Sequence, residues 1–180
     1  MATATVSSSP QERVGAVTFK GNPLTLIGPA ITVGARAPEF QTIAQDLSPV
    51  TLSSVKGKTL LISVVPSLDT PVCDAQTRRL NEEAAKLPNV QILAVSMDLP
   101  FAQKRWCGAA GIDKVKVVSD HKDASFGKAY GMLIKELRLL TRAIVLVDGA
   151  GTVRYVEYVP EVTSHPNYDA ALAATRQLAR

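Results

Sequence analysis

Residues 59–65 read TLLISVV and residues 66–73 read PSLDTPVC. The first segment is apolar or β-branched almost throughout, which is typical of a strand buried on both faces of a sheet. The second segment is a turn that leads into a helix, because Pro71 suits a first helical turn and polar residues that can cap it come just before. The helical pattern continues to about Leu87. Cys73 is therefore predicted to lie in the first turn of this helix.

Strand and helix signals alternate on both sides of this unit. The closing pair of strands is joined by a tight Asp-Gly-Ala-Gly turn, so one of them must run antiparallel to its neighbours. This order predicts an α/β fold, a three-layer sandwich around a mixed sheet with an N-terminal β-hairpin. Besides 59–65, strands are expected in the hairpin at 17–27 with a Gly21-Asn22 turn, and at 40–43, 50–52, 90–97, 115–119, 143–147 and 152–159. Further helices are expected at 123–130, at 164–178, and from Pro100 to near Gly108 or Gly111, the last with Asp98 as its cap.

The composition indicates one ordinary globular domain. A chain of 180 residues with 46% hydrophobic and 20% charged residues is neither disordered throughout nor fibrous. Residues 1–16 are rich in Ser, Thr and Ala, which favours a flexible leader. The predicted domain covers residues 17–180.

Charge and hydropathy exclude further classes of function. No apolar run approaches the ~18 residues that span a bilayer, and the first residues lack the pattern of a secretory signal. We therefore expect a cytoplasmic protein with no membrane role. The formal net charge is +4, but basic residues come singly or in pairs and aromatic residues are few, so nucleic acid is not an expected partner.

Cys73 is one of only two cysteines, too few for a disulfide scaffold. A helix N-terminus offers free amide N–H groups and partial positive charge, which favour a thiolate. The acidic neighbours Asp69 and Asp74 oppose this, so a cation from elsewhere in the chain is expected. A small, inert, buried thiol is the alternative, and placement alone does not choose between the two.

The residues around Cys73 form a pattern that is similar to a known active-site motif. Pro66, Thr70 and Cys73 form the pattern P-x-x-x-T-x-x-C, which resembles the active-site motif of the peroxiredoxins. The resemblance extends from Val17 to the C-terminal helix and is most similar to the thiol peroxidase subfamily, of the atypical two-cysteine type. It is carried by VPSLDTPVC at 65–73, QTRRLNE at 76–82, SMDLPFAQKRWCG at 96–108, LLTRAIVLVD at 139–148 and VRYVEYV at 153–159.

The resemblance implies a thioredoxin-like fold and a role for each matched residue. Cys73 would attack a hydroperoxide, either hydrogen peroxide or an organic one, and become a sulfenic acid. Cys107 would resolve it by forming an intramolecular disulfide, which thioredoxin would reduce. Thr70 would hydrogen-bond the thiolate and the peroxide, and Pro66 would shape and shield the site. Arg142 would stabilise the thiolate and the transition state.

Geometry adds two expectations to these roles. Arg142 stands just before the strand at 143–147, which could lie beside the strand at 59–65 and bring the guanidinium under the sulfur. Two cysteines can be bridged only when their Cα atoms come within about 7 Å. We therefore expect two helix ends that are ordered in the reduced state to unwind partly on oxidation, with Gly108 and Gly111 as the positions where the backbone yields most easily.

Alternatives remain for the second cysteine, the arginine and the histidines. Without the motif, Cys107 beside Trp106 would read as a buried inert thiol, and Arg142 as a solvated residue at a strand edge. His121 and His165 could join the cysteines in a Cys2His2 set, but their spacing is unlike that of zinc sites. No metal or other cofactor is expected.

Two rival functions fit the same cysteines. A dithiol oxidoreductase on the same fold is one, although the chain has no C-x-x-C motif. A non-enzymatic redox sensor, in which a Cys73–Cys107 disulfide changes partner binding, is the other. A homodimer is expected from the family resemblance.

Overall fold

The computed structural model describes residues 9–55 and 57–179 of the chain. The order of strands and helices from residue 59 onward is largely the predicted one, with a short additional hairpin inserted before residue 143. Over all the described residues the elements are β1 (Glu12–Phe19), β2 (Asn22–Ile27), β3 (Gln41–Ile43), β4 (Pro49–Thr51), α1 (Leu52–Val55), β5 (Thr59–Val64), α2 (Pro71–Ala84), β6 (Val90–Ser96), α3 (Pro100–Ala110), β7 (Lys116–Ser119), α4 (Ser125–Ala129), β8 (Leu133–Ile134), β9 (Leu139–Leu140), β10 (Ala143–Val147), β11 (Val153–Tyr158) and α5 (Tyr168–Leu178).

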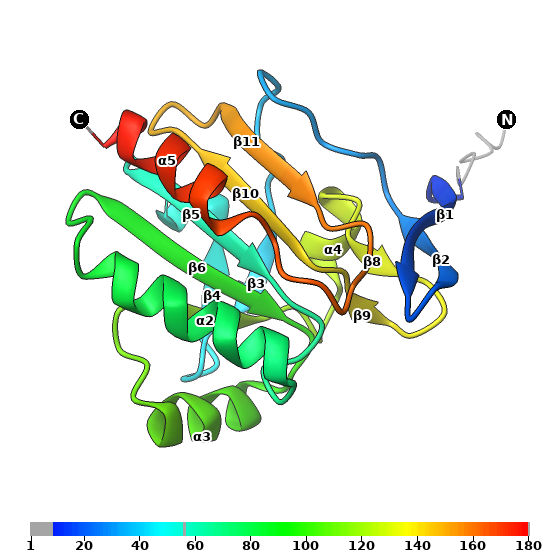
Figure 1. The fold of residues 1–180 in the computed structure, drawn as a ribbon, viewed down its shortest axis with the longest axis horizontal. Coiled ribbons are helices and arrows are strands. Elements are labelled where there is room, and N and C mark those ends of the chain that lie inside the picture. Colours follow the sequence, from blue (N-terminus) through cyan, green and yellow to red (C-terminus); the bar gives the residue numbers. More distant parts are fainter. Residues whose placement is uncertain (1–8, 56, 180) are drawn as a thin grey trace, which may run out of the picture.

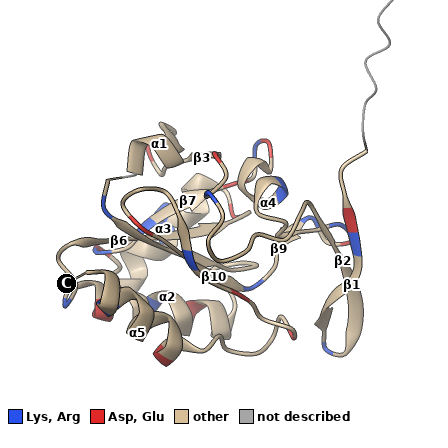
Figure 2. Ribbon diagram, turned by 90° about the horizontal axis from the view of Figure 1, so that it is seen from above, with Lys and Arg blue, Asp and Glu red and all other residues tan. Residues whose placement is uncertain are grey.

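The central sheet has the strand order β11-β10-β5-β6-β7-β3-β4. Strands β5, β6 and β7 run parallel, and β10 is antiparallel to both β5 and β11. Helices α2 and α5 cover one face of this sheet, and α1 and α4 lie on the other (Figures 1 and 2). The prediction of a thioredoxin-like three-layer sandwich around a mixed sheet is confirmed.

A second sheet of four strands, in the order β1-β2-β8-β9, contains the predicted N-terminal hairpin. Its turn consists of Lys20 and Gly21, one residue earlier than expected, and both have positive φ (48° and 80°). The tight hairpin turn favours this conformation, which Gly21 adopts without strain. Strand β1 begins at Glu12, ahead of the expected boundary at residue 17, while residues 1–8 of the expected leader lie outside the described residues.

Helix ends differ from the predictions at several places, and α4 covers Ser125–Ala129 rather than 123–130. Helix α2 ends at Ala84, short of Leu87. Helix α3 is preceded by Leu99 rather than by a capping Asp98. Helix α5 starts later than residue 164, because the side chain of Asn167 accepts a hydrogen bond from a first-turn amide. The starts of α3 and α5 differ because the carboxylate of Asp98 has other partners and because Asn167 caps α5.

Strand β5 positions the functional site, because all of its residues are buried and it lies in the middle of the sheet. Its last residue, Val64, pairs with Ala143 of β10. The chain then turns into α2, whose apolar side chains pack against the sheet together with those of α3 and α5. Each fully buried aliphatic side chain in such a core contributes about 1.5–3 kcal/mol. The residues of this cluster include Leu61, Leu80, Ile92, Val117, Ile144 and Leu172.

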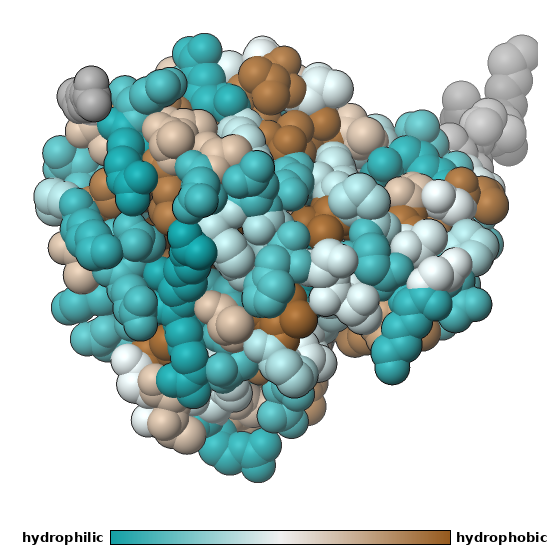
Figure 3. Space-filling view, in the orientation of Figure 1, coloured by the Kyte–Doolittle hydropathy of each residue, from teal (hydrophilic) through white to brown (hydrophobic). Residues whose placement is uncertain are grey.

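The surface is mixed in character. Figure 3 shows mostly hydrophilic residues, with apolar ones in small patches, and the hairpin of β1 and β2 standing out from the body. Basic and acidic residues are interspersed along the chain (Figure 2). Within residues 9–55 and 57–179, no helix has the length and apolar character needed to cross a membrane.

Candidate active site

Cys73 lies in the first turn of α2, as predicted, and its side chain is fully buried. Thr70 has extended backbone angles and is the N-cap residue, followed by Pro71 at the first helical position. Pro71 has no N–H to donate, and the amides of Val72 and Cys73 lie too early in the helix to have an intrahelical acceptor, so they present partial positive charge near the sulfur. A helix N-terminus of this kind stabilises a negatively charged group placed beside it.

The hydroxyl of Thr70 points back along the loop. Its Oγ1 donates to the backbone oxygen of Ser67 at 3.1 Å, and it makes no side-chain cap hydrogen bond to the helix. Pro66 is buried directly after the strand that leads to the site. Both residues therefore belong to the loop that precedes Cys73, and the Thr70 hydroxyl is bonded within that loop in this state.

Arg142 reaches Cys73 from the neighbouring strand. Its Nη2 donates to the Sγ of Cys73 at 3.3 Å, and Arg142 as a residue is 2% exposed. The expected pairing of the two strands is confirmed by the register of β10 on β5, which places Arg142 beside the end of β5. Two more hydrogen bonds fix the guanidinium: Nε donates to the backbone oxygen of Val162 at 2.8 Å, and Nη1 to the Oε1 of Gln76 at 3.0 Å. Both of these acceptors are neutral, so the positive charge remains available to the sulfur.

Gln76 is a site residue that the sequence reasoning did not single out. It is fully buried on α2, one helical turn after Cys73 and on the same face. Its Nε2 donates to the Oγ of Ser63 on β5 at 2.7 Å, which fixes the amide and directs Oε1 to Arg142. The only signal in the sequence was the spacing, because a polar residue at i+3 on a buried helical face needs a partner.

Asp98 ties the loop before Cys73 to the end of β6. Its carboxylate accepts hydrogen bonds from the Oγ of Ser67 at 2.7 Å, the amide of Leu68 at 2.8 Å and the Oγ of Ser96 at 2.6 Å. These three bonds explain why Asp98 does not cap α3. Its carboxylate instead holds the loop that carries Pro66 and Thr70.

Cys107 lies near the end of α3 and is 7% exposed. The Nε2 of Gln45 donates to its Sγ at 3.3 Å. Burial raises the pKa of the Cys107 thiol, and the hydrogen bond from Gln45 partly opposes that rise. Both cysteines are free, and both belong to the apolar cluster shared by α2 and α3.

A cavity of about 360 Å³ lies between the loop before Cys73 and α3. The cavity therefore lies beside the packed contact between this loop and the helix that carries Cys107. The cavity is lined by Ser67, Leu68, Asp69, Asp98, Ala102, Gln103, Arg105, Trp106 and Ala109.

The two histidines have other partners than the cysteines. His121 shares a hydrogen bond with Ser119 at 3.0 Å, and His165 shares one with the hydroxyl of Tyr168 at 2.8 Å. Across the part of the chain that the structure describes, no three His, Cys, Asp or Glu side chains gather in a way that could hold a metal ion. The chemistry that the geometry offers is therefore that of a buried thiol beside a fixed guanidinium.

Comparison with known proteins identifies the family. Residues 32–172 match the redoxin family. This chain belongs to that family. The redoxin is 59% identical to a thiol peroxidase from Halalkalibacterium halodurans over 91% of this chain and 98% of the relative. It is 55% identical to a thiol peroxidase from Bacillus subtilis, with the same coverage. These matches confirm the resemblance to the thiol peroxidases.

Solved structures agree with this assignment. The crystal structure of a peroxiredoxin-like protein from Aquifex aeolicus has a TM-score of 0.86 and 43% sequence identity to this redoxin. The match covers 92% of this chain and 98% of that one. The shared fold therefore extends over most of both chains.

Proposed function

We propose that this chain reduces hydroperoxides with Cys73 as the nucleophile that attacks the peroxide bond. As a peroxiredoxin it is an oxidoreductase, and its curated relatives are thiol peroxidases. The observation that carries the assignment to Cys73 is its 3.3 Å contact with the guanidinium of Arg142 in a buried site. A thiol so placed is held beside the planar, positively charged fork of an arginine, whose donors are fixed in direction.

The first step is an attack of the Cys73 thiolate on the terminal oxygen of the hydroperoxide. The O–O bond breaks, a bond forms between sulfur and oxygen, and the leaving oxygen takes a proton to become water or an alcohol. The sulfur is oxidised by two electrons to a sulfenic acid, and the peroxide is reduced. Arg142 stabilises negative charge as it develops on the leaving oxygen. Because its guanidinium is fixed by Val162 and Gln76, it needs no rearrangement to do so.

Thr70 and Pro66 complete the proposed site. The Thr70 hydroxyl lies in the residue that caps α2, and rotation about its side chain would let it donate to the peroxide instead of to Ser67. Pro66 is buried between β5 and the loop, where it limits the access of water to the sulfur. Exclusion of water strengthens the electrostatic contribution of Arg142.

The second step joins the two cysteines. Cys107 attacks the sulfur of the Cys73 sulfenic acid, a disulfide forms, and the hydroxyl leaves as water with the proton of the Cys107 thiol. A thioredoxin-type dithiol then reduces the disulfide by thiol–disulfide exchange. The free, buried state of both cysteines is consistent with a reduced resting form that must open locally before the disulfide closes.

The cellular setting and the oligomeric state belong to the same proposal. Both thiols are free, which fits a reducing compartment, and we propose the cytoplasm.

A homodimer is supported by two large apolar side chains exposed around the start of α3, Leu99 at 54% and Phe101 at 67%. Sedimentation of the wild type and of Phe101→Glu tests this: a monomeric wild type, or a dimer that Phe101→Glu leaves intact, would remove the support from this surface.

The pair of cysteine variants tests the proposed mechanism. We expect Cys73→Ser to abolish peroxide reduction. We expect Cys107→Ser to consume one equivalent of peroxide and accumulate a sulfenic acid that dimedone traps on Cys73. Full activity of Cys73→Ser, or the absence of a Cys73–Cys107 disulfide in the peroxide-treated wild type, would refute the mechanism.

Turnover separates the peroxidase from a redox sensor built on the same disulfide. With excess thioredoxin, thioredoxin reductase and NADPH, a peroxidase continues to oxidise NADPH for many equivalents of peroxide per chain. A sensor of the same structure would stop after one oxidation.

A further inference from the structure

Arg78 joins the two helices that carry the cysteines. It lies on α2, and its Nη1 donates to the backbone oxygen of Ala110, the last residue of α3, at 3.0 Å. The guanidinium also lies 5.9 Å from the centroid of the Trp106 ring on α3. The last carbonyls of a helix have no partner within it, and a cation there is favoured by the helix dipole. Arg78 therefore caps α3 from a neighbouring helix.

Asp74 fixes the orientation of Arg78. The Nε of Arg78 donates to the Oδ2 of Asp74 at 2.7 Å, in an i,i+4 pair along α2. Asp74 directly follows Cys73 in the first turn of the helix. The cap on the end of α3 therefore depends on a carboxylate that keeps its place only while the first turn of α2 is helical.

The segment that follows α3 is also bonded to α2. Gly111, with φ of +68°, ends the helix, and Asn81 of α2 accepts a hydrogen bond from the amide of Lys114 at 2.8 Å. The chain is thus anchored to α2 both at Ala110 and at Lys114. Loss of the first anchor alone would free the last turn of α3, which contains Cys107, without detaching the segment that follows.

We propose that Arg78 is a positioning residue for the resolving step, holding Cys107 in place until the first turn of α2 unwinds. The inference rests on the proposed function, in which both helix ends open to form the disulfide. Cys73 and Asp74 are adjacent, so unwinding that presents the Cys73 sulfur also moves the Asp74 carboxylate. Arg78 then loses the acceptor that orients it, the carbonyl of Ala110 loses its cap, and the end of α3 opens more readily. The two helices therefore open together.

The coupling affects only the second chemical step. Attack on the hydroperoxide uses α2 in its helical form, with Cys73 beside Arg142. Disulfide formation replaces the S–O bond of the Cys73 sulfenic acid with an S–S bond to Cys107 and releases water. A bridge that must break before this step prolongs the life of the sulfenic acid, and so increases its further oxidation by peroxide to sulfinic acid.

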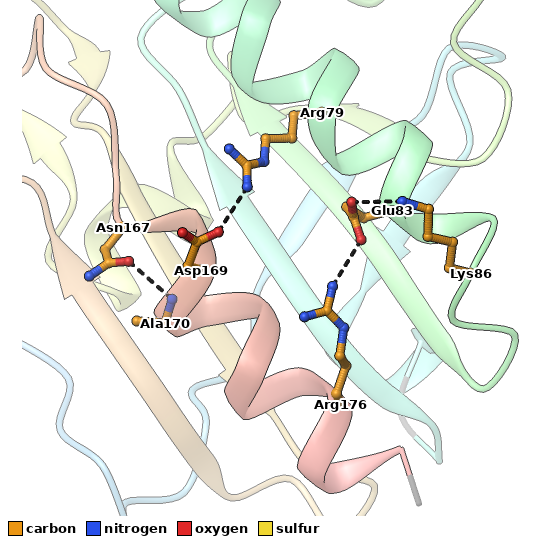
Figure 4. A network of polar contacts seen from close by, with 7 residues as sticks. All are labelled: Arg79, Glu83, Lys86, Asn167, Asp169, Ala170 and Arg176. Carbon is orange, nitrogen blue, oxygen red and sulfur yellow. Dashed lines mark hydrogen bonds and ion pairs between the residues drawn. The ribbon is translucent and has the colours of Figure 1, made fainter.

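Arg78→Gln is the test, and Arg79→Gln is its matched control. Both remove one positive charge from adjacent positions on α2, but Arg79 pairs with Asp169 of α5 and not with α3 (Figure 4). Stopped-flow fluorescence of Trp106 with a fixed excess of peroxide separates oxidation of Cys73 from disulfide formation. We expect Arg78→Gln to speed disulfide formation roughly two- to tenfold, the effect of losing one hydrogen bond and one surface ion pair. The rate of Cys73 oxidation should not change.

The dependence of Arg78 on Asp74 can be tested by the rates of disulfide formation in single and double variants. Asp74→Asn should also speed disulfide formation, and the double variant with Arg78→Gln should be no faster than Arg78→Gln alone. Sulfinic acid on Cys73, measured by mass spectrometry after repeated peroxide additions, should fall in Arg78→Gln and stay at the wild-type level in Arg79→Gln. A purely structural role for Arg78 would instead change both chemical steps.

Hydrogen exchange of the reduced protein tests the bridge without any peroxide. The amides of Gly111 and Ile112 both donate to the backbone oxygen of Cys107. Their exchange should be roughly two- to tenfold faster in Arg78→Gln than in the wild type or Arg79→Gln. Unchanged exchange, or unchanged or slower disulfide formation, would overturn the proposal. If the wild type formed no Cys73–Cys107 disulfide, the proposed function would fail while the exchange result still decided whether Arg78 holds the end of α3.

Discussion

The guanidinium of Arg142, the residue just before β10, donates to the sulfur of Cys73 in the first turn of α2 at 3.3 Å. The two residues are far apart in sequence and meet because β10 and β5 are neighbouring antiparallel strands. The other hydrogen bonds of the guanidinium go to neutral oxygens. The sulfur is therefore the one partner that can carry a negative charge among the three acceptors of Arg142.

Replacement of Arg142 should slow the first chemical step. We expect Arg142→Gln to lower the second-order rate constant of Cys73 with hydrogen peroxide by about 10²–10³-fold, the usual cost of losing one preorganised charge-stabilising donor. Competition with a peroxidase of known rate measures it, and circular dichroism checks the fold. Arg154→Gln is the matched control, because Arg154 is an exposed arginine that pairs with Asp148. Equal rates for the two variants would contradict the role given to Arg142.

Gln76 should matter through Arg142 rather than by touching the sulfur. Gln76→Met keeps the volume but leaves Nη1 of Arg142 without its acceptor. We expect a free energy of unfolding lower by about 1–3 kcal/mol, the cost of a buried unpaired donor, and a slower reaction of Cys73 with peroxide. Ser63→Ala removes only the group that orients Gln76, so it should have a smaller effect on both quantities. Urea unfolding under reducing conditions and the same competition assay measure them; a larger effect of Ser63→Ala would contradict this order.

The sequence could predict most strands of the central sheet and the longer helices on its faces, because their hydrophobic patterns are bounded by clear turn signals. The paired strands β8 and β9 were missed, since Leu133–Ile134 and Leu139–Leu140 are too short to show a pattern. The residues that cap the helices were also predicted less well than the helices themselves. Asp98 has the residue type of an N-cap, but its carboxylate bonds to the loop before Cys73, a long-range contact that local pattern does not contain.

The residues of the candidate site also fall into those that local sequence identifies and those that only long-range contacts identify. Cys73, Thr70 and Pro66 lie in one local motif and could be identified from it, whereas Arg142 needed the family resemblance to be singled out. Gln76 and Arg78 act through contacts with other elements, to Ser63 and Arg142 in one case and to Ala110 in the other. Their types and spacing are ordinary for a helix, so only the packed structure shows what they bind.

Cys107 should be a slow nucleophile while α3 is intact. Burial raises the pKa of its thiol, so less of it is thiolate at a given pH, and 7% exposure limits access. In Cys73→Ser, we expect iodoacetamide to alkylate Cys107 at least about tenfold more slowly at pH 8.5 than the same protein unfolded in urea. Quenched samples analysed by mass spectrometry give both rates. Equal rates would show that Cys107 is already open in the reduced state.

Asp120 should make the stability of the protein depend on pH. Its carboxylate is 2% exposed and accepts hydrogen bonds from the amides of Phe126 and Gly127 at the start of α4. Burial is the main cause that raises its pKa to about 6, above the ordinary value of about 3.9. Between these values the folded protein retains a proton that the unfolded chain has lost. The contribution of Asp120 to stability is therefore fully present below about pH 4 and is lost as the pH rises through about 6.

The difference between the wild type and Asp120→Asn isolates this effect. A pKa shift of this size corresponds to about 3 kcal/mol in full, and most of it is present at pH 4, so the free energy of unfolding of the wild type, relative to Asp120→Asn, should fall by about 2 kcal/mol from pH 4 to pH 7. Urea unfolding at several pH values with a thiol reductant measures it. Asp123→Asn, at an exposed neighbouring position, serves as the control and should show no such trend relative to the wild type. A difference between wild type and Asp120→Asn that stayed constant with pH would mean that Asp120 keeps an ordinary pKa despite its burial.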